Sequence, residues 1–397
     1  MRGTRHGSTT YEIPLSEPLL SGNEWSYVRE CIETGWVSSA GAFVNRFEDA
    51  VVDYVGAVHA VAVVNGTSAL HLSLLGCGVG AGDEVIVPAL TFAATANAVR
   101  YVGAHPVFMD CEPETLCIDV QKLSDFIHRE CARGRDGFLR NGRTGRRVKA
   151  VIPVHVFGHP VEMDPLIEIC GDSGVTVIED AAESLGSFYR GRHTGTFGLA
   201  GCFSFNGNKI ITAGGGGMVV TDDPELAARM RHLSRQAKSD PFEYDHDDVG
   251  YNYALSNIQA AVGLAQMERL DEYVAVKRRN AALYMDLLSG FEEVSFLGAR
   301  PWVESNCWFY TLKVAVEERT ALMGYLMSKG IQVRPLWKPL HLLSVYRDEQ
   351  AYRIEHALRA HASCFNLPCS VGLGGEEIEF VVRCIRSFYS DGRRRVC

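Results

Sequence analysis

The sequence predicts an α/β fold in which a large domain with a mostly parallel sheet is followed by a smaller α+β domain. Short apolar runs alternate with helical segments over about two hundred residues, which is the pattern of parallel strands joined by crossover helices. The pattern changes after Tyr253, where a long helical segment leads into a different mixture of helices and strands. We therefore expect a large domain with an N-terminal arm over residues 1–264 and a smaller domain over residues 265–397.

The expected elements follow one another in a regular order. A first helix begins near Glu24 and carries Trp25, Val28 and Ile32 on one face, and the apolar spacing predicts a second helix over residues 43–54. The strands expected next are residues 60–64, 84–88, 105–109, 150–154, 175–178 and, in the smaller domain, 309–314. The further helices expected are residues 69–77, 91–101 with Thr91 as N-cap, 256–276 and 278–288. Ligands on such a sheet bind at the carboxyl ends of the strands.

The composition narrows the class of protein. Hydrophobic residues make up 47% of the 397 residues, and the formal net charge of -9 argues against a nucleic-acid partner. The basic cluster at residues 133–149 is expected to be a solvated loop. Twelve scattered cysteines without CxxC or Cys/His spacing indicate reduced thiols and predict no metal site. Because no apolar stretch could span a bilayer and the N-terminus lacks an apolar signal segment, we expect a cytoplasmic protein without membrane contact.

Residues 201–220, GCFSFNGNKIITAGGGGMVV, place Lys209 between apolar runs and in front of four consecutive glycines. A cation among apolar neighbours is costly to bury, so Lys209 is expected either to be solvated or to lose its proton readily. A loop lysine that points to water explains the position, and so does a Schiff-base lysine with a nucleophilic amine. The glycines would let backbone approach a ligand where a Cβ would clash. From this stretch alone both interpretations stay open.

Two groups of hydroxyls could hold a phosphate near this lysine. The segment NGTS, which includes Thr67 and Ser68, leads from a strand into a helix, where free N–H groups and hydroxyls favour an anion. A plain helix N-cap has the same sequence signature. Ser204 lies on the strand that enters the Lys209 segment and offers another hydroxyl for the same phosphate.

A carboxylate pair ends the strand VIEDAAE at residues 177–183. Glu179 and Asp180 point to opposite sides of an extended chain, so only one of them is expected to face a ligand. Asp180 could keep the ring nitrogen of a cofactor cationic, or it could cap a helix. Phe92, one residue past a strand–helix turn, could be a stacking platform or a core residue.

The motifs together resemble the DegT/DnrJ/EryC1/StrS family of nucleotide-sugar aminotransferases, which depend on pyridoxal 5′-phosphate (PLP). The resemblance implies the fold of type I PLP transferases, with a seven-stranded type of sheet in the large domain. It runs from about residue 13 to residue 367 and rests on the order and spacing of several segments. These segments are NGTSALHL, PALTFAATANAV, PVHVFGHP, VIEDAAESLGS, FSFNGNKIITAGGGGM and GYNYALSNIQAA.

The resemblance also implies roles for individual residues. Lys209 would hold PLP as a Schiff base, Asp180 would pair with the ring nitrogen, and Phe92 would stack on the ring. Glu183 stands where similar enzymes often carry His or Gln near the phenolic oxygen of the cofactor. The phosphate contacts implied are Thr67, Ser68, Ser204 and, from the neighbouring subunit, Asn252. The candidates for sugar and nucleotide contacts are Trp36, Ser38, Ser39, His155, Lys338 and His341, although either histidine could equally be structural.

The implied reaction is ping-pong transamination from L-glutamate to a nucleotide-linked keto sugar, in a homodimer with shared active sites. The segments GNEWSYVRECIETGWVSS and SFNGNKIITAGGGGM are especially similar to enzymes that aminate C4 of 4-keto-6-deoxyhexoses in legionaminic acid, bacillosamine and perosamine synthesis. We expect a UDP-linked, 2-N-acetylated acceptor, with a GDP-perosamine-type or 3-keto-sugar aminotransferase as the alternative. A PLP-dependent sugar dehydratase is disfavoured because that branch looks like it replaces the lysine with histidine. A non-catalytic binding protein would not need Lys209, Asp180 and the hydroxyls together.

Overall fold

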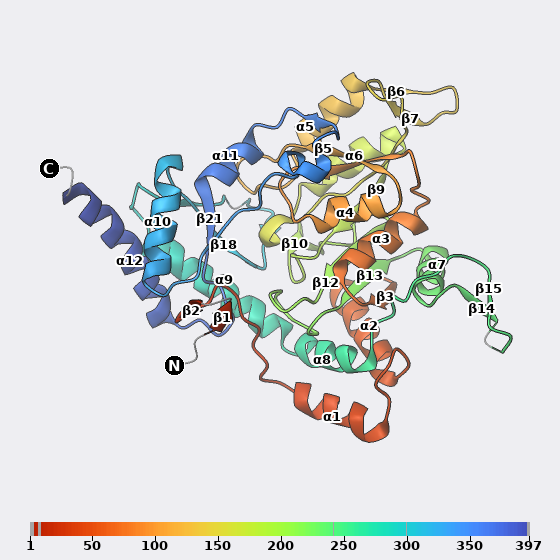
Figure 1. The fold of residues 1–397 in the computed structure, drawn as a ribbon, viewed down its shortest axis with the longest axis horizontal. Coiled ribbons are helices and arrows are strands. Elements are labelled where there is room, and N and C mark those ends of the chain that lie inside the picture. The colour runs from red at the N-terminus through yellow and green to blue at the C-terminus, as the bar shows by residue number, and fades with distance from the viewer. Residues whose placement is uncertain (1–3, 7–8, 241, 299, 395–397) are drawn as a thin grey trace.

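The computed structural model describes residues 4–6, 9–240, 242–298 and 300–394, which are organised around an eight-stranded sheet (Figure 1). The strand order is β20-β5-β4-β8-β9-β12-β13-β3. Neighbours from β20 to β12 are parallel, whereas β13 is antiparallel to both β12 and β3. The strands are β3 His59–Val63, β4 Glu84–Pro88, β5 His105–Met109, β8 Val148–Val151, β9 Thr176–Asp180, β12 Ala200–Ser204, β13 Gly217–Thr221 and β20 Ala351–Tyr352. The predicted α/β class with a mostly parallel sheet is confirmed, but the sheet has eight strands rather than the seven implied by the resemblance, because β20 pairs with β5 at its edge.

Helices cover this sheet and leave its strands almost free of solvent. β4 and β13 are buried along their whole length, as expected for strands with apolar residues on both faces. The helix α3 packs on β12 and β13, α4 packs on β4 and β5, and α6 packs on β9. The helical elements of this region are α2 Ala42–Val55, α3 Gly66–Gly76, α4 Ala94–Tyr101, α5 Val120–Asp125, η1 Phe126–Glu130, η2 Val156–Gly158, α6 Met163–Ser173, α7 Pro224–Ser234 and α8 Asn257–Met267.

The first predicted helix is α1, Glu24–Thr34, which packs on α8. Its expected apolar face does not enter the core of this chain, because Trp25 is 76% exposed and Ile32 is 61% exposed. The second predicted helix, α2, does bury its apolar face, including Phe43, Phe47 and Val51.

Several local expectations were wrong at their boundaries. The helix expected over residues 69–77 begins earlier, as α3 at Gly66, and Asn65 is its N-cap, since the Asn65 side chain accepts a hydrogen bond from the Ser68 N–H. Thr91 does not cap a helix, because α4 begins only at Ala94 and Thr91 is buried at the end of a loop. The helix expected over residues 256–276 is broken between α8 and α9 at Arg269, whose φ of -113° and ψ of 2° are not helical.

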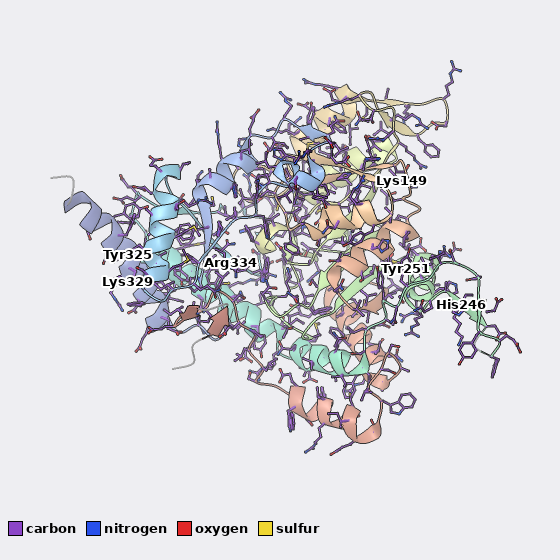
Figure 2. All side chains as sticks on the ribbon, in the orientation of Figure 1. Lys149, His246, Tyr251, Tyr325, Lys329 and Arg334 are labelled. Carbon is purple, nitrogen blue, oxygen red and sulfur yellow. The ribbon has the colours of Figure 1, made fainter. Side chains whose placement is uncertain are left out.

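The basic cluster at residues 133–149 is more ordered than the solvated loop that we expected. It includes the end of the hairpin formed by β6 Cys131–Arg133 and β7 Leu139–Asn141, and it enters the large sheet in β8, where Figure 2 labels Lys149. Asn141 is fully buried, and its amide donates to Glu84 at 2.7 Å and to Gln350 at 2.8 Å. Arg133, Arg135 and Arg143 of this cluster are nevertheless exposed.

The C-terminal part of the chain builds a second sheet beside the first. This four-stranded antiparallel sheet has the order β16-β18-β21-β19, and α10 packs on it through β21 (Figure 1). Its elements and the helices around it are α9 Leu270–Leu287, β16 Ser295–Phe296, β18 Tyr310–Lys313, α10 Val316–Ser328, β19 Arg334–Pro335, η3 Leu340–Leu342, η4 Ser344–Tyr346, α11 His356–Ser363, β21 Cys364–Leu367 and α12 Gly375–Arg394. The domain boundary at residue 265 stays a prediction, and β20 returns from this part of the chain to the edge of the large sheet.

Smaller sheets complete the described structure. A hairpin near the N-terminus pairs two short strands, another hairpin projects beyond α7, and a three-stranded sheet has the order β11-β10-β17. The strands are β1 Thr4–His6, β2 Thr9–Tyr11, β10 Phe188–Tyr189, β11 Arg192–His193, β14 Lys238–Asp240, β15 Asp245–His246 and β17 Val303–Glu304. Within the described ranges, no helix combines the length and apolar character needed to cross a membrane.

Asp110 ties the C-terminal segment to the edge of the large sheet. It follows β5, and its carboxylate accepts hydrogen bonds at 2.9 Å from the backbone N–H groups of Glu355, His356 and Ala357 at the start of α11. Lys122 adds an ion pair at 2.7 Å. Burial opposes ionisation of this carboxylate, but these donors together hold the pKa of Asp110 below its usual value.

We predict that Asp110→Ala lowers the free energy of unfolding by about 3 to 5 kcal/mol, because it removes the acceptor for three N–H groups at the start of α11 and the closest ion-pair partner of the largely buried Lys122 ammonium. The urea midpoint, followed by circular dichroism, measures this loss. Glu355→Ala is the matched control, since Glu355 is 64% exposed and lies 3.7 Å from Lys122. It should change stability by less than about 0.5 kcal/mol. Equal midpoints for the two variants would contradict the prediction.

Candidate active site

Four strands of the large sheet end at one edge and deliver the candidate site. β3, β4, β9 and β12 run in the same direction, because β13 reverses the chain between β12 and β3. Their carboxyl ends lead into the start of α3, the loop before α4, the turn after Asp180 and the segment that holds Lys209. Ligands bind at this edge of parallel sheets.

These segments line a cavity of about 800 Å³, a volume typical of small-molecule sites. One side of the cavity is formed by residues predicted from the sequence, namely Thr67, Phe92, Asp180, Glu183, Ser204 and Lys209. The opposite wall comes from distant parts of the chain and includes residues 14–17, Trp308, Gln332, Arg334, Trp337 and Asn366. The cavity therefore lies between the large sheet and the four-stranded sheet.

Lys209 follows β12 and is largely buried, with 14% of its side chain exposed. Its Nζ atom lies 3.7 Å from Oε1 of Glu183 and 3.8 Å from the ring centroid of Trp308. Burial lowers the pKa of Lys209, while the Glu183 and Asp180 carboxylates oppose that change. Of the two interpretations of this lysine, the structure therefore favours a tuned amine over a loop lysine that points to water.

The glycine run has two functions in the backbone. Gly217 lets β13 pass close to the start of α3, since a Cβ there would lie 2.5 Å from the carbonyl carbon of Asn65. Gly216 has a φ of +138°, which side chains rarely adopt, and it lines the cavity together with Gly215. The glycines were expected to let backbone come close to a ligand. In the structure, Gly217 lets two backbone segments come close to each other, while Gly215 and Gly216 line the cavity.

The start of α3 faces Ser204 across the edge of the sheet. A Cβ on Gly66 would lie 2.9 Å from Cβ of Ser204, so the helix N-terminus and this hydroxyl are close neighbours. Thr67 lines the cavity, whereas Ser68 is buried outside the cavity lining and donates its N–H to Asn65 at 2.8 Å. The positive end of the helix dipole and the nearby hydroxyls form a site suited to a phosphate.

Glu179 and Asp180 lie on opposite sides of β9, as the strand geometry predicts. Glu179 is fully buried away from the cavity, and its carboxylate accepts hydrogen bonds from the backbone N–H groups of Gly195, Phe197 and Gly198 at 2.6 to 2.7 Å. Burial opposes its ionisation, but these donors and a hydrogen bond from His155 hold the pKa of Glu179 below its usual value. Glu179 is a structural carboxylate.

Asp180 is buried and lines the cavity. Its Oδ2 atom accepts a hydrogen bond from the Thr95 hydroxyl at 2.8 Å, and Oδ1 accepts one from the Ala182 N–H at 3.2 Å. Burial raises the pKa of Asp180, and the bond from Thr95 acts in the opposite direction. No basic side chain among the described residues forms an ion pair with it. The carboxylate is therefore free to pair with a cationic ligand.

The sequence matches the DegT/DnrJ/EryC1/StrS aminotransferase family over residues 18–386. The chain belongs to this family. It is 39% identical to GDP-perosamine synthase of Caulobacter vibrioides over 382 residues, and this match covers 94% of this chain and 97% of the relative. It is 38% identical to GDP-perosamine synthase of Escherichia coli O157:H7, with 96% and 99% covered. The crystal structure of a DegT DnrJ EryC1 StrS aminotransferase from Brucella abortus has a TM-score of 0.84 at 30% identity, with 92% and 95% covered.

Membership of the DegT/DnrJ/EryC1/StrS family makes this chain a PLP-dependent sugar aminotransferase. The residues at the cavity fit that cofactor. A buried carboxylate without a basic partner, Asp180, suits a cationic ring nitrogen, and the N-terminus of α3 with Ser204 suits a phosphate. Lys209 offers the only amine of a lysine side chain that lines the cavity in the described part of the chain.

Two predicted cofactor contacts, Phe92 and Asn252, are exposed to solvent. Phe92 lines the cavity but is 59% exposed, so one of its surfaces is open to a ligand or to a second chain. Asn252 is exposed and does not line the cavity of its own chain. Asn252 pairs with Arg235 in an isolated β-bridge. Its neighbours in the chain, Tyr251 and Tyr253, stack their rings with centroids 5.0 Å apart.

The predicted substrate contacts lie outside the cavity lining of this chain. Trp36, Ser38 and Ser39 are exposed in the loop between α1 and α2. Lys338 is exposed, and His341 is half-buried in η3. For these five residues a substrate role stays a prediction.

His155 requires a correction, because its ring has no nitrogen left for a substrate. The residue is fully buried, its Nε2 atom donates to Glu179 at 2.9 Å, and its Nδ1 atom accepts the Val161 N–H at 3.1 Å. The hydrogen bond from Val161 requires an unprotonated Nδ1 atom, so the proton of the neutral ring is on Nε2. Of the two interpretations of His155, a substrate contact or a structural histidine, the hydrogen bonds favour the structural one.

Sequence reasoning missed the far wall of the cavity. Arg334, labelled in Figure 2, comes from β19 of the four-stranded sheet. Among the described residues, Arg334 and Lys209 are the two basic residues that line the cavity. Trp308 donates its indole N–H to the backbone oxygen of Asn208 at 2.7 Å and so fixes the segment next to Lys209. Neither residue belongs to a motif with a recognisable spacing, because their neighbours in space are distant in sequence.

We predict that Thr95→Val weakens PLP binding by about tenfold to a hundredfold, because a hydrogen bond to a charged group contributes about 1.5 to 3 kcal/mol. Without the hydroxyl, the pKa of Asp180 should rise further and its charge should be less available to the ring nitrogen. Titration of the PLP-free protein, followed by visible absorbance, measures the dissociation constant. Thr95→Ser keeps the hydroxyl and should bind PLP nearly as the wild type does. Wild-type affinity in Thr95→Val would refute this role.

Proposed function

We propose that the protein transfers an amino group to C4 of a nucleotide-linked 4-keto-6-deoxyhexose, with L-glutamate as the donor. The observation that carries the proposal is that Lys209 and Asp180, delivered by two different strands, line one cavity of about 800 Å³. A sugar aminotransferase needs this pairing, since one group moves protons and the other supports the electron sink.

A GDP-linked acceptor is better supported than the UDP-linked, 2-N-acetylated sugar expected from the sequence. Two relatives that match nearly the whole chain are GDP-perosamine synthases, at 39% and 38% identity. We therefore place a GDP-linked 4-keto-6-deoxyhexose first and keep the UDP-linked sugar and a 3-keto sugar as alternatives. The product would serve amino-sugar and polysaccharide biosynthesis.

Each residue of the site has a defined task in this proposal. When bound, PLP supplies the electron sink that makes the substrate carbon acidic. The amine of Lys209 would take up and return the proton of this carbon. Asp180 would hold the positive charge on the ring nitrogen, Phe92 would stack on the ring, and the start of α3 with Ser204 would hold the phosphate.

The far wall is suited to anionic, sugar-bearing substrates. Arg334 has no ion pair with a carboxylate among the described residues, so its guanidinium is available for a carboxylate or a diphosphate. Trp308 and Trp337 present aromatic surfaces within the same cavity. L-glutamate and the nucleotide-linked sugar, the two substrates of the proposed ping-pong reaction, are both anions. They would occupy the cavity in turn, so the guanidinium of Arg334 could bind each of them.

We predict that the purified enzyme, supplied with L-glutamate, aminates a GDP-linked 4-keto-6-deoxyhexose more efficiently than its UDP- or dTDP-linked counterparts. Mass spectrometry and product NMR report the sugar and the aminated carbon. Lys209→Ala is the control, and it should bind PLP without turnover because only the amine is lost. Amination at C3, or turnover by Lys209→Ala at a rate near that of the wild type, would contradict the proposal.

We further propose a homodimer in which Asn252 contacts the PLP phosphate of the partner subunit. Asn252 is exposed and away from its own cavity, in a turn stiffened by stacked tyrosines (Figure 2 labels Tyr251). Large apolar side chains remain uncovered on α1 and the loop after it, where Trp25 is 76% and Trp36 is 58% exposed. Exposed apolar surface of this kind favours an interface between subunits.

Mixed dimers test this arrangement. Asn252→Ala and Lys209→Ala chains should each be impaired alone, but a heterodimer of the two contains one site with both lesions and one intact site. Its activity should therefore reach up to about half of the wild-type value, given independent sites. Differently tagged chains allow the heterodimer to be purified for the assay. If it is no more active than either parent, Asn252 serves its own subunit or no site.

A further inference from the structure

Glu183 is a buried carboxylate at the site to which the proposed reaction gives no task. It lines the cavity three residues after Asp180, and only 5% of the residue is exposed. Its Oε1 atom lies 3.7 Å from Nζ of Lys209, which is its one ion-pair partner among the described residues. Its Oε2 atom accepts the backbone N–H of Phe157 at 2.8 Å.

Two rigid contacts fix the position of Glu183. Phe157 has a φ of +54°, which is rare for a residue with a side chain, and its ring stacks on Trp337 with centroids 4.8 Å apart. This backbone aims the N–H of Phe157 at the carboxylate. On the other side, the Asn306 amide donates to the backbone oxygen of Glu183 at 2.9 Å. The carboxylate is therefore held in place rather than free to turn to solvent.

The charges around Glu183 are few. Asp180 at the end of β9 and Lys209 in the segment after β12 face it. Cys117 is a buried thiol whose pKa is raised to about 12 by desolvation, so it stays neutral. Burial raises the pKa of Glu183 to about 7, and the nearby Lys209 opposes this change. The site thus holds one lysine nitrogen between the aromatic ring of Trp308 and a carboxylate that ionises near neutral pH.

We propose that Glu183 is a positioning residue that sets the pH at which the nitrogen of Lys209 loses its proton. The inference rests on the proposed function, in which Lys209 must be neutral to take a proton and cationic after taking it. The Asp180 carboxylate also favours the cationic lysine, but in the proposed function its charge pairs with the ring nitrogen, whereas Glu183 forms the ion pair with Lys209. An ionised Glu183 stabilises the cationic form of the lysine nitrogen, whereas a neutral side chain at this position does not.

The test is a pH titration of the visible absorbance of the PLP-loaded protein, which reports the protonation of the PLP–Lys209 chromophore. Glu183→Gln keeps an acceptor for the Phe157 N–H but removes the charge. Loss of a negative charge disfavours the cation, so the titration midpoint should move to lower pH, by about one to three units. The pH profile of kcat/KM should move in the same direction. Glu183→Asp keeps the charge farther from Lys209 and should give a smaller shift.

Glu17→Gln is the matched control, because Glu17 lines the same cavity without an ion pair to Lys209 among the described residues. Its midpoint should equal that of the wild type. An unchanged midpoint in Glu183→Gln, or an equal shift in Glu17→Gln, overturns the inference. A wild-type protein that develops no visible chromophore with PLP would contradict the proposed function and this inference together. Normal colour with an unchanged midpoint contradicts the role of Glu183 alone.

Discussion

The alternation of side chains along β9 is the constraint on which the site depends. Successive residues of a strand face opposite sides, so Glu179 and Asp180 cannot both reach the cavity. Backbone N–H groups from residues 195–198 and the ring of His155 satisfy Glu179 on the inner side. Because β9 lies between β8 and β12, its end cannot shift, and Asp180 is held at the cavity with one side-chain donor, Thr95.

Burial of charge is the second organising feature, and it follows from the first. Asp180, Glu183 and Lys209 are largely buried next to one another. Desolvation lowers the pKa of Lys209, and the two carboxylates raise it. Buried charges of this kind are stable only when they compensate one another or a ligand. Asp180 forms no ion pair with a basic side chain among the described residues, so its negative charge is available to a cationic ligand in the cavity.

The cavity is closed by segments that lie far apart in the sequence. The N–H of Leu15 donates to the Gln332 side chain at 2.9 Å, and the N–H of Glu17 donates to the Ser370 hydroxyl at 2.9 Å. The N-terminal segment is thereby bound to the C-terminal part of the chain while it lines the cavity. Trp308 reaches the same place from the loop before β18. Segments from distant parts of the chain thus line one cavity.

Local patterns in the sequence determined the α/β class, the strands at residues 84–88 and 105–109 to the residue, and the position of Asp180 at the end of a strand. These features depend on periodicity and on neighbours within a few residues, which a sequence displays directly. Only the tertiary structure decided that both ring nitrogens of His155 are used within the protein, that the Thr95 hydroxyl donates to Asp180, and that Arg334 lines the cavity. The hydrogen bonds of His155 with Glu179 and of Thr95 with Asp180 join residues 24 and 85 positions apart, and they depend on how the sheet and its loops pack, which no local pattern records.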